Sequence, residues 1–256
     1  MGNYYKFLNI GFGDTYVLHL GSKIVMVDCY EDDGTREHVA NHIPGGVIDV
    51  LILTHRHFDH YYGIQALLDN NISVREVWET CWVRKEDDQS IDREQWQKCQ
   101  GLVDQLESRG AMLRKLSAGT QPLSVENCNF YVLNPPADTN EDASSELHDG
   151  CLVLLLESDG QKEILFCGDA YNRVLDRVAD TCDVAGTRIL TASHHGALDS
   201  VSEKLLDRVR PEYTVISNTY GTFGLEQQEE AIRIYRKYSG KGVLCTYVDG
   251  TIVIDG

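Results

Sequence analysis

The sequence contains no uninterrupted apolar run of about 20 residues, the length that a helix needs to cross a bilayer. Residues 1–6 also lack the apolar stretch of a secretory signal peptide. The eight cysteines are scattered and include no Cys-x-x-Cys pair, and several lie in apolar segments, where Cys behaves as a small hydrophobic residue. These absences predict a cytoplasmic protein with reduced cysteines and no membrane association.

Basic residues are scarce relative to acidic ones. The chain has 23 Lys and Arg against 40 Asp and Glu, which gives a formal net charge of −17. Nonspecific binding of nucleic acid depends on contacts between basic side chains and phosphates, so this balance disfavours a general nucleic-acid-binding protein. A solvated acidic surface that keeps the protein soluble is the simpler interpretation.

The chain shows no internal repeat and no low-complexity linker, so we expect a single domain over residues 1–256. Apolar segments with strand character alternate with amphipathic helices. Strands are predicted at 4–10, 15–20, 23–29, 48–54, 73–79, 151–157, 162–168, 187–193, 213–217, 243–247 and 251–254. Helices are predicted at 34–42, 61–69, 92–109, 200–209 and 226–237, with a Pro-, Asp- and Ser-rich loop over 134–149.

The most informative segment is 54–60, which reads Thr-His-Arg-His-Phe-Asp-His and directly follows the apolar strand 50–53. Imidazole and carboxylate groups are ligands of zinc, iron and manganese. His55 and His57 are two positions apart, so in an extended segment they point to the same side. Asp59 and His60 lie where the chain turns into the next helix, offset enough to serve a second ion. The segment predicts a dinuclear metal site.

This motif resembles the His-x-His-x-Asp-His signature of the metallo-β-lactamase superfamily. Other segments match the family in order, namely the glycine-rich turn at 11–14, Gly168-Asp169 at a strand end, and the turn at 194–196, His-His-Gly. Within the superfamily, residues 5–254 look most like the metal-binding domain of bacterial DNA-uptake channel proteins of the ComEC type and its stand-alone relatives. The resemblance implies an αββα sandwich, with two mixed β-sheets and helices on both outer faces.

The resemblance also implies a ligand set for two divalent ions, most simply Zn²⁺, with Mn²⁺ or Fe as alternatives. The ligands it implies are His55, His57 and His148 for the first ion, Asp59, His60 and His194 for the second, and Asp169 between them. Asp28 is expected to orient a ligand histidine. No metal role is expected for His19, His38 and His42, and Tyr61, Tyr62 and Tyr220 are expected to contribute packing.

Two of these ligands have competitors nearby. His148 is followed by Asp149 and an early glycine, and DNA-uptake relatives usually have Asn at this position, so Asp149 is the alternative ligand. His194 directly follows the strand 189–193, where family ligands lie, which favours it over His195. His195 is then expected to be a proton donor or an oxyanion partner outside the ligand set.

The resemblance implies hydrolysis by a water activated between two ions, with Asp59 able to accept a proton. Oxygen-reducing diiron relatives have Glu where this chain has His57, which disfavours redox chemistry. We expect a phosphodiesterase or nuclease acting on a small-molecule or nucleotide-like substrate, and basic residues near 233–237 could contact phosphate. Single-stranded DNA is disfavoured by the net charge of −17 and by Gly-Thr-Phe at 221–223, where relatives have Gly-His-Pro.

Two other functions are compatible with the sequence. One is a hydrolase of carboxylic esters, lactones or thioesters, which would use the same two ions on a carbonyl carbon. The other is a metal-binding interaction module with little catalysis. The sequence carries no signal for an oligomeric state.

Overall fold

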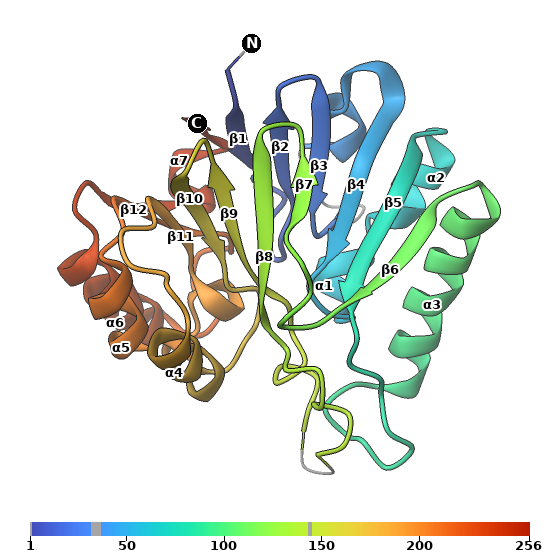
Figure 1. Ribbon diagram of the computed structural model, residues 1–256. Helices are drawn as coiled ribbons and strands as arrows, with labels where there is room; N and C mark the ends of the chain where they lie inside the picture. The colour runs from blue at the N-terminus through green and yellow to red at the C-terminus, as the bar shows by residue number, and fades with distance from the viewer. Residues whose placement is uncertain (1, 32–36, 143–144) are drawn as a thin grey trace.

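The computed structural model describes residues 2–31, 37–142 and 145–256. In this part of the chain, two seven-stranded sheets lie face to face, and helices cover the outer face of each (Figure 1). The predicted αββα sandwich is confirmed. No helix among the described residues is both long enough and apolar enough to span a bilayer.

The first sheet has the strand order β14-β1-β2-β3-β4-β5-β6. Its strands are β1 (Tyr4–Phe7), β2 (Tyr16–Leu20), β3 (Lys23–Val27), β4 (Val47–Leu53), β5 (Ser73–Thr80), β6 (Met112–Leu116) and β14 (Ile252–Asp255). Strands β1 to β3 form an antiparallel meander, whereas β3, β4, β5 and β6 are parallel neighbours. The carboxyl ends of β3 and β4 therefore lie at the same edge of the sheet.

The second sheet has the strand order β13-β12-β11-β10-β9-β8-β7. Its strands are β7 (Leu123–Val125), β8 (Cys128–Asn134), β9 (Val153–Ser158), β10 (Gln161–Phe166), β11 (Ile189–Thr191), β12 (Tyr213–Ile216) and β13 (Gly242–Cys245). Strands β10 to β13 are parallel, so their carboxyl ends also share one edge. Open parallel sheets bind ligands at this edge.

Helices complete the two outer layers. The first sheet is covered by α1 (Phe58–Tyr61), α2 (Ile64–Asp69) and α3 (Arg93–Ser108), and the second by α4 (Asn172–Thr181), α5 (Glu203–Val209) and α6 (Leu225–Tyr238) (Figure 1). The remaining helical turns are α7 (Thr246–Asp249), η1 (Val39–His42), η2 (Pro44–Gly46), η3 (Ser193–Gly196) and η4 (Leu198–Ser200).

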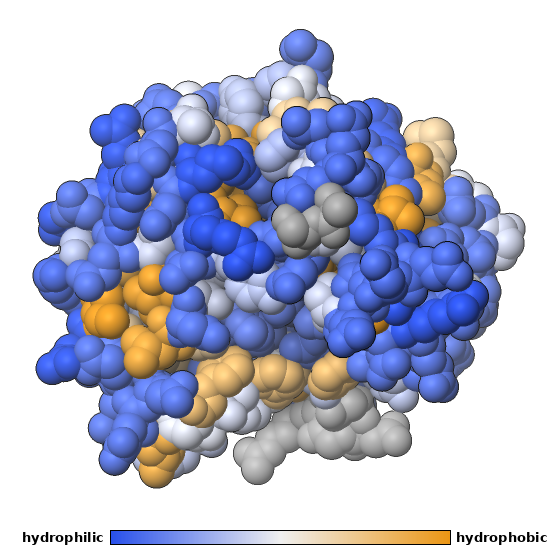
Figure 2. All heavy atoms as spheres, turned by 90° about the horizontal axis from the view of Figure 1, so that it is seen from below, coloured by the Kyte–Doolittle hydropathy of each residue, from blue (hydrophilic) through white to orange (hydrophobic). Residues whose placement is uncertain are grey.

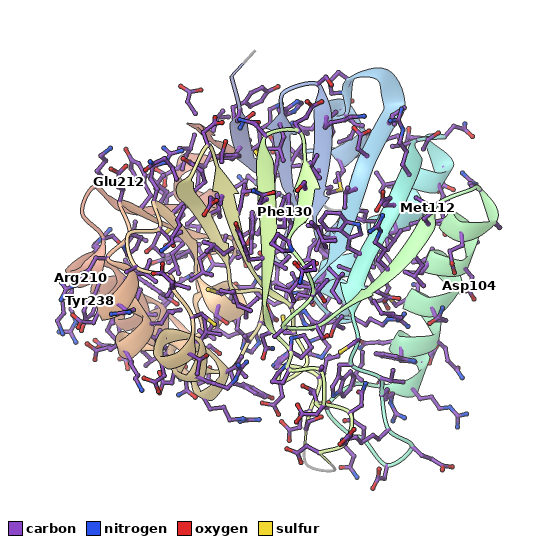
Figure 3. The ribbon with its side chains drawn as sticks, in the orientation of Figure 1. Asp104, Met112, Phe130, Arg210, Glu212 and Tyr238 are labelled. Atoms are coloured by element: carbon purple, nitrogen blue, oxygen red, sulfur yellow. The ribbon has the colours of Figure 1, made fainter. Side chains whose placement is uncertain are left out.

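The main core lies between the two sheets. Buried side chains of both sheets meet there, among them Phe7, Phe130 and Phe166. Phe130 of β8 lies in the middle of the sandwich, whereas Asp104 and Met112 lie at its outer side and Arg210 approaches Tyr238 at the opposite side (Figure 3). Burial of this apolar surface is the main favourable contribution to folding. Separate cores lie beneath the helices of each outer layer.

Four elements lie where the sequence analysis assigned none, namely β6, β7, β8 and α4. Along β8, buried and half-buried residues alternate, and α4 buries Val174, Leu175, Val178 and Ala179 at helical spacing, so both patterns carried a usable signal. The sequence of β6 carried little such signal, because β6 is an edge strand with mostly exposed side chains.

Some predicted boundaries were wrong. Of the helix predicted over 34–42, residues 34–36 lie outside the described part of the chain, and the described residues 37–42 contain only the short turn η1 at 39–42, followed by Pro44. The helix predicted over 61–69 starts earlier, as α1, and continues as α2. The strand predicted over 243–247 ends at Cys245, where α7 begins.

Candidate metal centre

Histidine and aspartate side chains from both sheets meet at the shared carboxyl edge. His55 follows β4, Asp169 follows β10, and His194 and His195 follow β11. Because each sheet is parallel in this region, these strand ends arrive at one end of the sandwich, which is the lower end in Figure 1. The fold therefore brings residues from distant parts of the chain into one cluster.

A first group consists of His55, His57, His148 and Asp169, whose ligand atoms lie within 4.8 Å of one another. His57 Nδ1 lies 3.1 Å from His148 Nε2. His55 Nε2 and His148 Nε2 lie 3.5 and 3.9 Å from Asp169 Oδ2. Asp149 is not in this group, because its carboxylate accepts two hydrogen bonds from Arg173, at 2.8 and 2.7 Å.

A second group consists of Asp14, His60, Asp169 and His195. His60 Nε2 lies 3.2 Å from Asp169 Oδ1, whereas Asp169 Oδ2, which faces the first group, also lies 3.7 Å from His195 Nε2. Asp59 lies beside this second group, with its Oδ2 3.0 Å from His195 Nε2 and 4.0 Å from His60 Nε2. Asp169 is thus shared, as a bridging carboxylate would be.

The neighbours His194 and His195 differ from the sequence-based expectation. His195 is completely buried, and its Nε2 faces Asp59 and Asp169, at 3.0 and 3.7 Å. The side chain of His194 is 26% exposed, and its Nε2 lies 3.9 Å from Asp169 Oδ2. The structure therefore places His195, rather than His194, in the second group.

The backbone after β11 explains this difference. Both histidines have positive φ angles, 50° at His194 and 53° at His195, so the chain curls instead of continuing as a strand. The N–H of His194 donates to the carbonyl of Gly168 at 2.9 Å, which holds the turn against the end of β10. Non-glycine residues at positive φ are unfavourable unless the surrounding structure enforces them, and they cluster at functional sites.

Several of the histidines, His60, His195 and His57 among them, have one ring nitrogen held by a protein group. His60 Nδ1 lies 2.8 Å from Asp28 Oδ2, in agreement with the orienting role expected of Asp28. His195 Nδ1 faces the carbonyl of Ser217 at 3.1 Å and Asp14 Oδ1 at 3.3 Å. His57 Nε2 lies 3.3 Å from the carbonyl oxygen of Ser90. Each contact leaves the opposite nitrogen directed at the cluster, as in histidines that bind metal.

The cluster passes a test of fit to metal ions. His55 Nε2, His60 Nε2 and Asp169 Oδ1 are buried and lack a well-oriented hydrogen bond, although His60 Nε2 and Asp169 Oδ1 lie 3.2 Å apart. Buried polar atoms in proteins nearly always have a partner, so a converging set without one is suited to a cation. A set of imidazole nitrogens and carboxylate oxygens fits zinc, manganese or iron. The histidines His19, His38 and His42, for which no metal role was expected, lie outside both groups.

Electrostatics differ between the two groups. In the first, burial lowers the pKa of His55 well below its usual range and that of His148 to about 3, so these imidazoles are neutral. In the second, burial alone would lower the pKa values of His60 and His195, but nearby carboxylates, first among them Asp169, raise both well above the usual range. Without an ion, the second group therefore holds protons that bound metal would replace.

Two glycines are required by close contacts at the site. A Cβ at Gly13 would lie 2.6 Å from the carbonyl oxygen of Asp59, and the φ angle of Gly13 is 124°. At Gly168, with φ of 47°, a Cβ would lie 2.5 Å from Cys151 Sγ. Glycine alone avoids both contacts at these angles. The glycine-rich turn at 11–14 thus allows the N-terminal loop to reach the metal motif.

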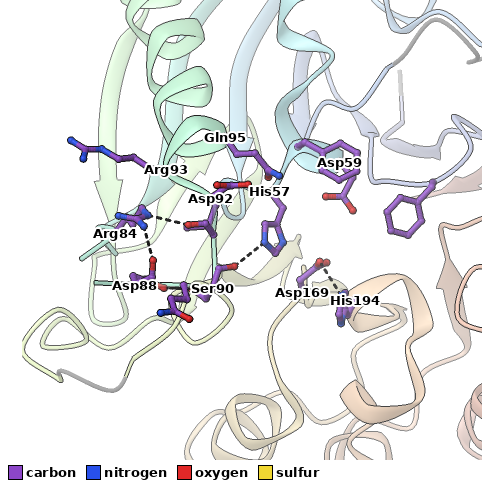
Figure 4. A pocket seen from close by; sticks show the side chains of 14 residues that line it. His57, Asp59, Arg84, Asp88, Ser90, Asp92, Arg93, Gln95, Asp169 and His194 are labelled. Atoms are coloured by element: carbon purple, nitrogen blue, oxygen red, sulfur yellow. Dashed lines mark hydrogen bonds and ion pairs between the residues drawn. The ribbon is translucent and has the colours of Figure 1, made fainter. Parts of the chain in front are cut away.

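A pocket of about 660 Å³ opens beside the cluster (Figure 4). Its lining includes Asp59, Asp169, His57 and His194, so the pocket gives access to the side-chain atoms that are candidates for binding metal. The rest of the lining comes from Phe12, Phe58 and the loop 84–92, with Arg93 and Gln95 at the start of α3. Asp59 and Asp169 face each other across the opening in Figure 4.

The sequence analysis did not single out Asp14, Ser90 or Phe12 for a role at the site. Asp14 belongs to the glycine-rich turn that had been noted, so its position in that motif was a usable signal. Ser90 contacts His57 through its backbone carbonyl, and its residue type gave no signal of this contact. Tyr61 is buried, as packing requires, whereas Tyr62 and Tyr220 are exposed at 38% and 66%.

Comparison with known proteins supports a relation of this chain to the metallo-β-lactamase superfamily. Residues 8–75 match the family model of the metallo-β-lactamase superfamily. No curated protein matches this chain by sequence. The match and the sandwich together identify the metallo-β-lactamase fold. A closer relation to DNA-uptake channel proteins is not shown and stays a prediction.

Solved structures share this fold at low sequence identity. CmlA, a diiron β-hydroxylase from Streptomyces venezuelae, has a TM-score of 0.67 and 12% identity over 100% of this chain, which spans only 54% of CmlA. The metallo-β-lactamase fold protein YhfI from Bacillus subtilis has a TM-score of 0.62 and 12% identity, with 99% and 100% of the two chains covered. A diphosphatase from the PhnP family has a TM-score of 0.57 and 11% identity, with 99% and 98% covered.

Proposed function

We propose that this protein is a metal-dependent hydrolase that cleaves phosphodiester bonds in a small or nucleotide-like substrate. The observation that carries the proposal is the convergence of buried, unpartnered imidazole and carboxylate atoms around Asp169, beside an open pocket. A solved structure with the same fold is described as a diphosphatase, which favours phosphorus over carbon as the reaction centre.

The proposed ligands follow from the two groups. His55, His57 and His148 would hold one ion, Asp59, His60 and His195 the other, and Asp169 would bind both. This set assigns His195 to the second ion in place of His194, because only the buried His195 has its Nε2 next to Asp59. Asp14 faces Nδ1, on the other side of the His195 ring, and would orient it as Asp28 orients His60.

Two divalent ions, when bound, supply Lewis-acid polarisation of the phosphoryl group and lower the pKa of a nucleophilic water. The protein supplies the proton transfers. Asp59 can accept a proton at the oxygen not facing its neighbours. His194 lines the pocket, and its Nδ1 lies 3.3 Å from Ser200 Oγ, which orients the ring. His194 would protonate the leaving oxygen, the role that was expected of His195.

Polymeric DNA is a weaker candidate than a small diester. Arg233 is paired with Glu230, and Lys237 Nζ lies 2.9 Å from Glu203. Neither these residues nor Arg236 is among the described residues that line the pocket beside the cluster. The basic residues of α6 are therefore not placed to bind a phosphate chain leading into this site.

Hydrolysis of esters, lactones or thioesters is the second candidate function. It is favoured by the apolar part of the pocket, which Phe12 and Phe58 line. The guanidinium of Arg84, which also lines the pocket, donates to backbone carbonyls of its own loop and so is already engaged. A neutral acyl group would be accommodated by such a pocket.

The test combines metal analysis with turnover. The chain is purified with added Zn²⁺ or Mn²⁺, its metal content is measured, and rates are compared for bis-p-nitrophenyl phosphate, a lactone and a thioester. We expect about two ions per chain and turnover of the phosphodiester that falls by orders of magnitude in Asp169→Asn. Asp180→Asn, a change of an exposed aspartate on α4, is the matched control. Absence of bound metal would overturn the proposal, and turnover of only the lactone or thioester would favour the second candidate.

A further inference from the structure

Apolar side chains form a row across the largely hydrophilic face at the lower end of the sandwich (Figure 2). Among the residues near this end, Phe12 and Phe58 line the pocket beside the metal cluster, and Phe58 is 41% exposed. Phe223 lies beside Phe12, with its ring 6.3 Å from that of Phe12 and 5.5 Å from that of His194. We call Phe12, Phe58 and Phe223 the aromatic shelf.

The shelf is close to the reacting centre. The ring of Phe12 lies 4.8 Å from that of His195, and Phe58 lies between two candidate ligands in the sequence. The shelf comes from three separate segments, namely the loop after β1, the start of α1 after β4 and the loop after β12. Exposed or half-buried aromatic rings that converge beside a pocket from separate segments are placed to bind an apolar part of a ligand.

The opposite wall of the pocket is polar. Gln95 Oε1 is buried and has no hydrogen-bond partner, and Asp88 accepts hydrogen bonds from the N–H and hydroxyl of Ser90. Arg84 donates to the carbonyl oxygens of Ile91, Lys85 and Asp88, so its guanidinium stabilises the loop. The pocket therefore has one apolar side and one polar side.

The charge of the pocket limits the anionic groups that it can accept. Four aspartates line it, Asp59, Asp88, Asp92 and Asp169, together with two arginines. The side chain of Arg93 is directed away from His57, Asp59 and Asp169 (Figure 4). The lining therefore carries more acidic than basic side chains, and the two proposed ions would offset this acidity, which favours a ligand of low negative charge over a chain of phosphates.

We infer that the aromatic shelf is a specificity subsite, which binds a planar apolar group next to the scissile bond of a substrate with no more than one negative charge. An aryl phosphodiester has this chemistry. The inference rests on the proposed function, because the shelf is defined relative to the same catalytic centre. It adds that the group attached to the phosphorus, rather than a polyanionic chain, determines recognition.

The experiment compares the binding of methyl phenylphosphonate and methyl methylphosphonate, two phosphonate esters that each carry one negative charge, to the full chain loaded with zinc, by calorimetry. Wild type is expected to bind the phenylphosphonate ester at least about tenfold more tightly, because burying a phenyl ring is favourable. In Phe58→Ala and in Phe223→Ala, the ratio of the two dissociation constants should fall towards one while the metal content stays unchanged. Tyr62→Ala removes an exposed aromatic residue that belongs neither to the shelf nor to the lining of the pocket, and should keep the wild-type ratio.

The outcomes separate the two proposals. Equal binding of both phosphonates by wild type, or an unchanged ratio in both phenylalanine variants, would overturn the shelf and leave the hydrolase standing. Failure of either phosphonate to bind protein that carries two zinc ions would overturn the phosphodiesterase proposal as well, since no phosphoryl group would then be bound at the site.

Discussion

His60 Nδ1 and Asp28 Oδ2 lie 2.8 Å apart, and both side chains are completely buried. The same carboxylate accepts hydrogen bonds from the N–H and hydroxyl of Thr54, at 2.8 and 2.7 Å. Asp28 itself has a φ angle of 55°, a left-handed conformation that is uncommon outside glycine but that Asp adopts more readily than most residues. One carboxylate thus joins the end of β3 to the end of β4 and directs His60 Nε2 towards Asp169.

We expect Asp28→Asn to weaken binding of the second ion by about 10- to 100-fold, because the amide keeps the shape but removes the charge that supports His60. Competition with a chelator measures this affinity. Asp49→Asn is the control, since Asp49 accepts from Lys23 and Arg75 at a surface away from the cluster. Unchanged affinity for both ions in Asp28→Asn would show that the contact does not support metal binding.

The adjacent histidines should have separable roles. We expect His195→Ala to lose the second ion, because its buried Nε2 faces Asp59 and Asp169. His194→Ala should keep both ions and lose turnover by roughly 10²- to 10⁴-fold, the usual effect of removing a general acid. Metal content and rate are measured on the same samples. If only His194→Ala lost metal, His194 would be the ligand and His195 the proton donor, as the sequence predicted.

Affinity for the second ion should depend on pH more steeply than affinity for the first. Carboxylates raise the pKa values of His60 and His195, so both rings carry protons near neutral pH until metal replaces them. Binding should then release about two protons, and affinity should fall as the pH decreases. At the first group, where burial lowers the pKa values of His55 and His148, little release is expected near neutral pH. Calorimetry in buffers of different ionisation enthalpy measures these protons, and equal release at both steps would contradict the assignment.

A buried ion pair next to the motif should control stability. Arg56 and Glu79 are each 1% exposed in their side chains and lie 2.7 Å apart, and Lys115 Nζ lies 2.5 Å from the other oxygen of Glu79. Glu79→Gln leaves the Arg56 charge buried without its partner, so we expect the free energy of unfolding to fall by about 3–5 kcal/mol. Arg75→Gln, in a pair whose arginine is 59% exposed, should cost at most about 1 kcal/mol. Urea unfolding of the metal-free protein measures the free energy of unfolding of both variants. Equal decreases in the two variants would mean that burial of an ion pair does not determine its contribution to stability.

Several features could be predicted from the sequence because they depend on short-range patterns. The alternation of apolar strands and amphipathic helices indicated a layered α/β fold, and residues 54–60 placed four potential ligands at the end of one strand. Strand ends such as Gly168-Asp169 were also visible, because an apolar run followed by Gly and Asp is a local signal. The family resemblance led us to expect that Asp28 orients a ligand histidine, and its carboxylate lies 2.8 Å from His60 Nδ1.

Other features depend on how distant segments meet. The burial of His195 in the second group, with His194 at the pocket, follows from two positive φ angles and from the hydrogen bond between the His194 N–H and the carbonyl of Gly168. Gly168 lies 26 residues earlier in the chain, and no local pattern encodes either feature. Ser90 acts through a backbone carbonyl, which every residue possesses. The aromatic shelf exists only because the segments after β1, β4 and β12 converge. Local patterns therefore determined which residue types were available, whereas the packing of two sheets decided which of them face one another.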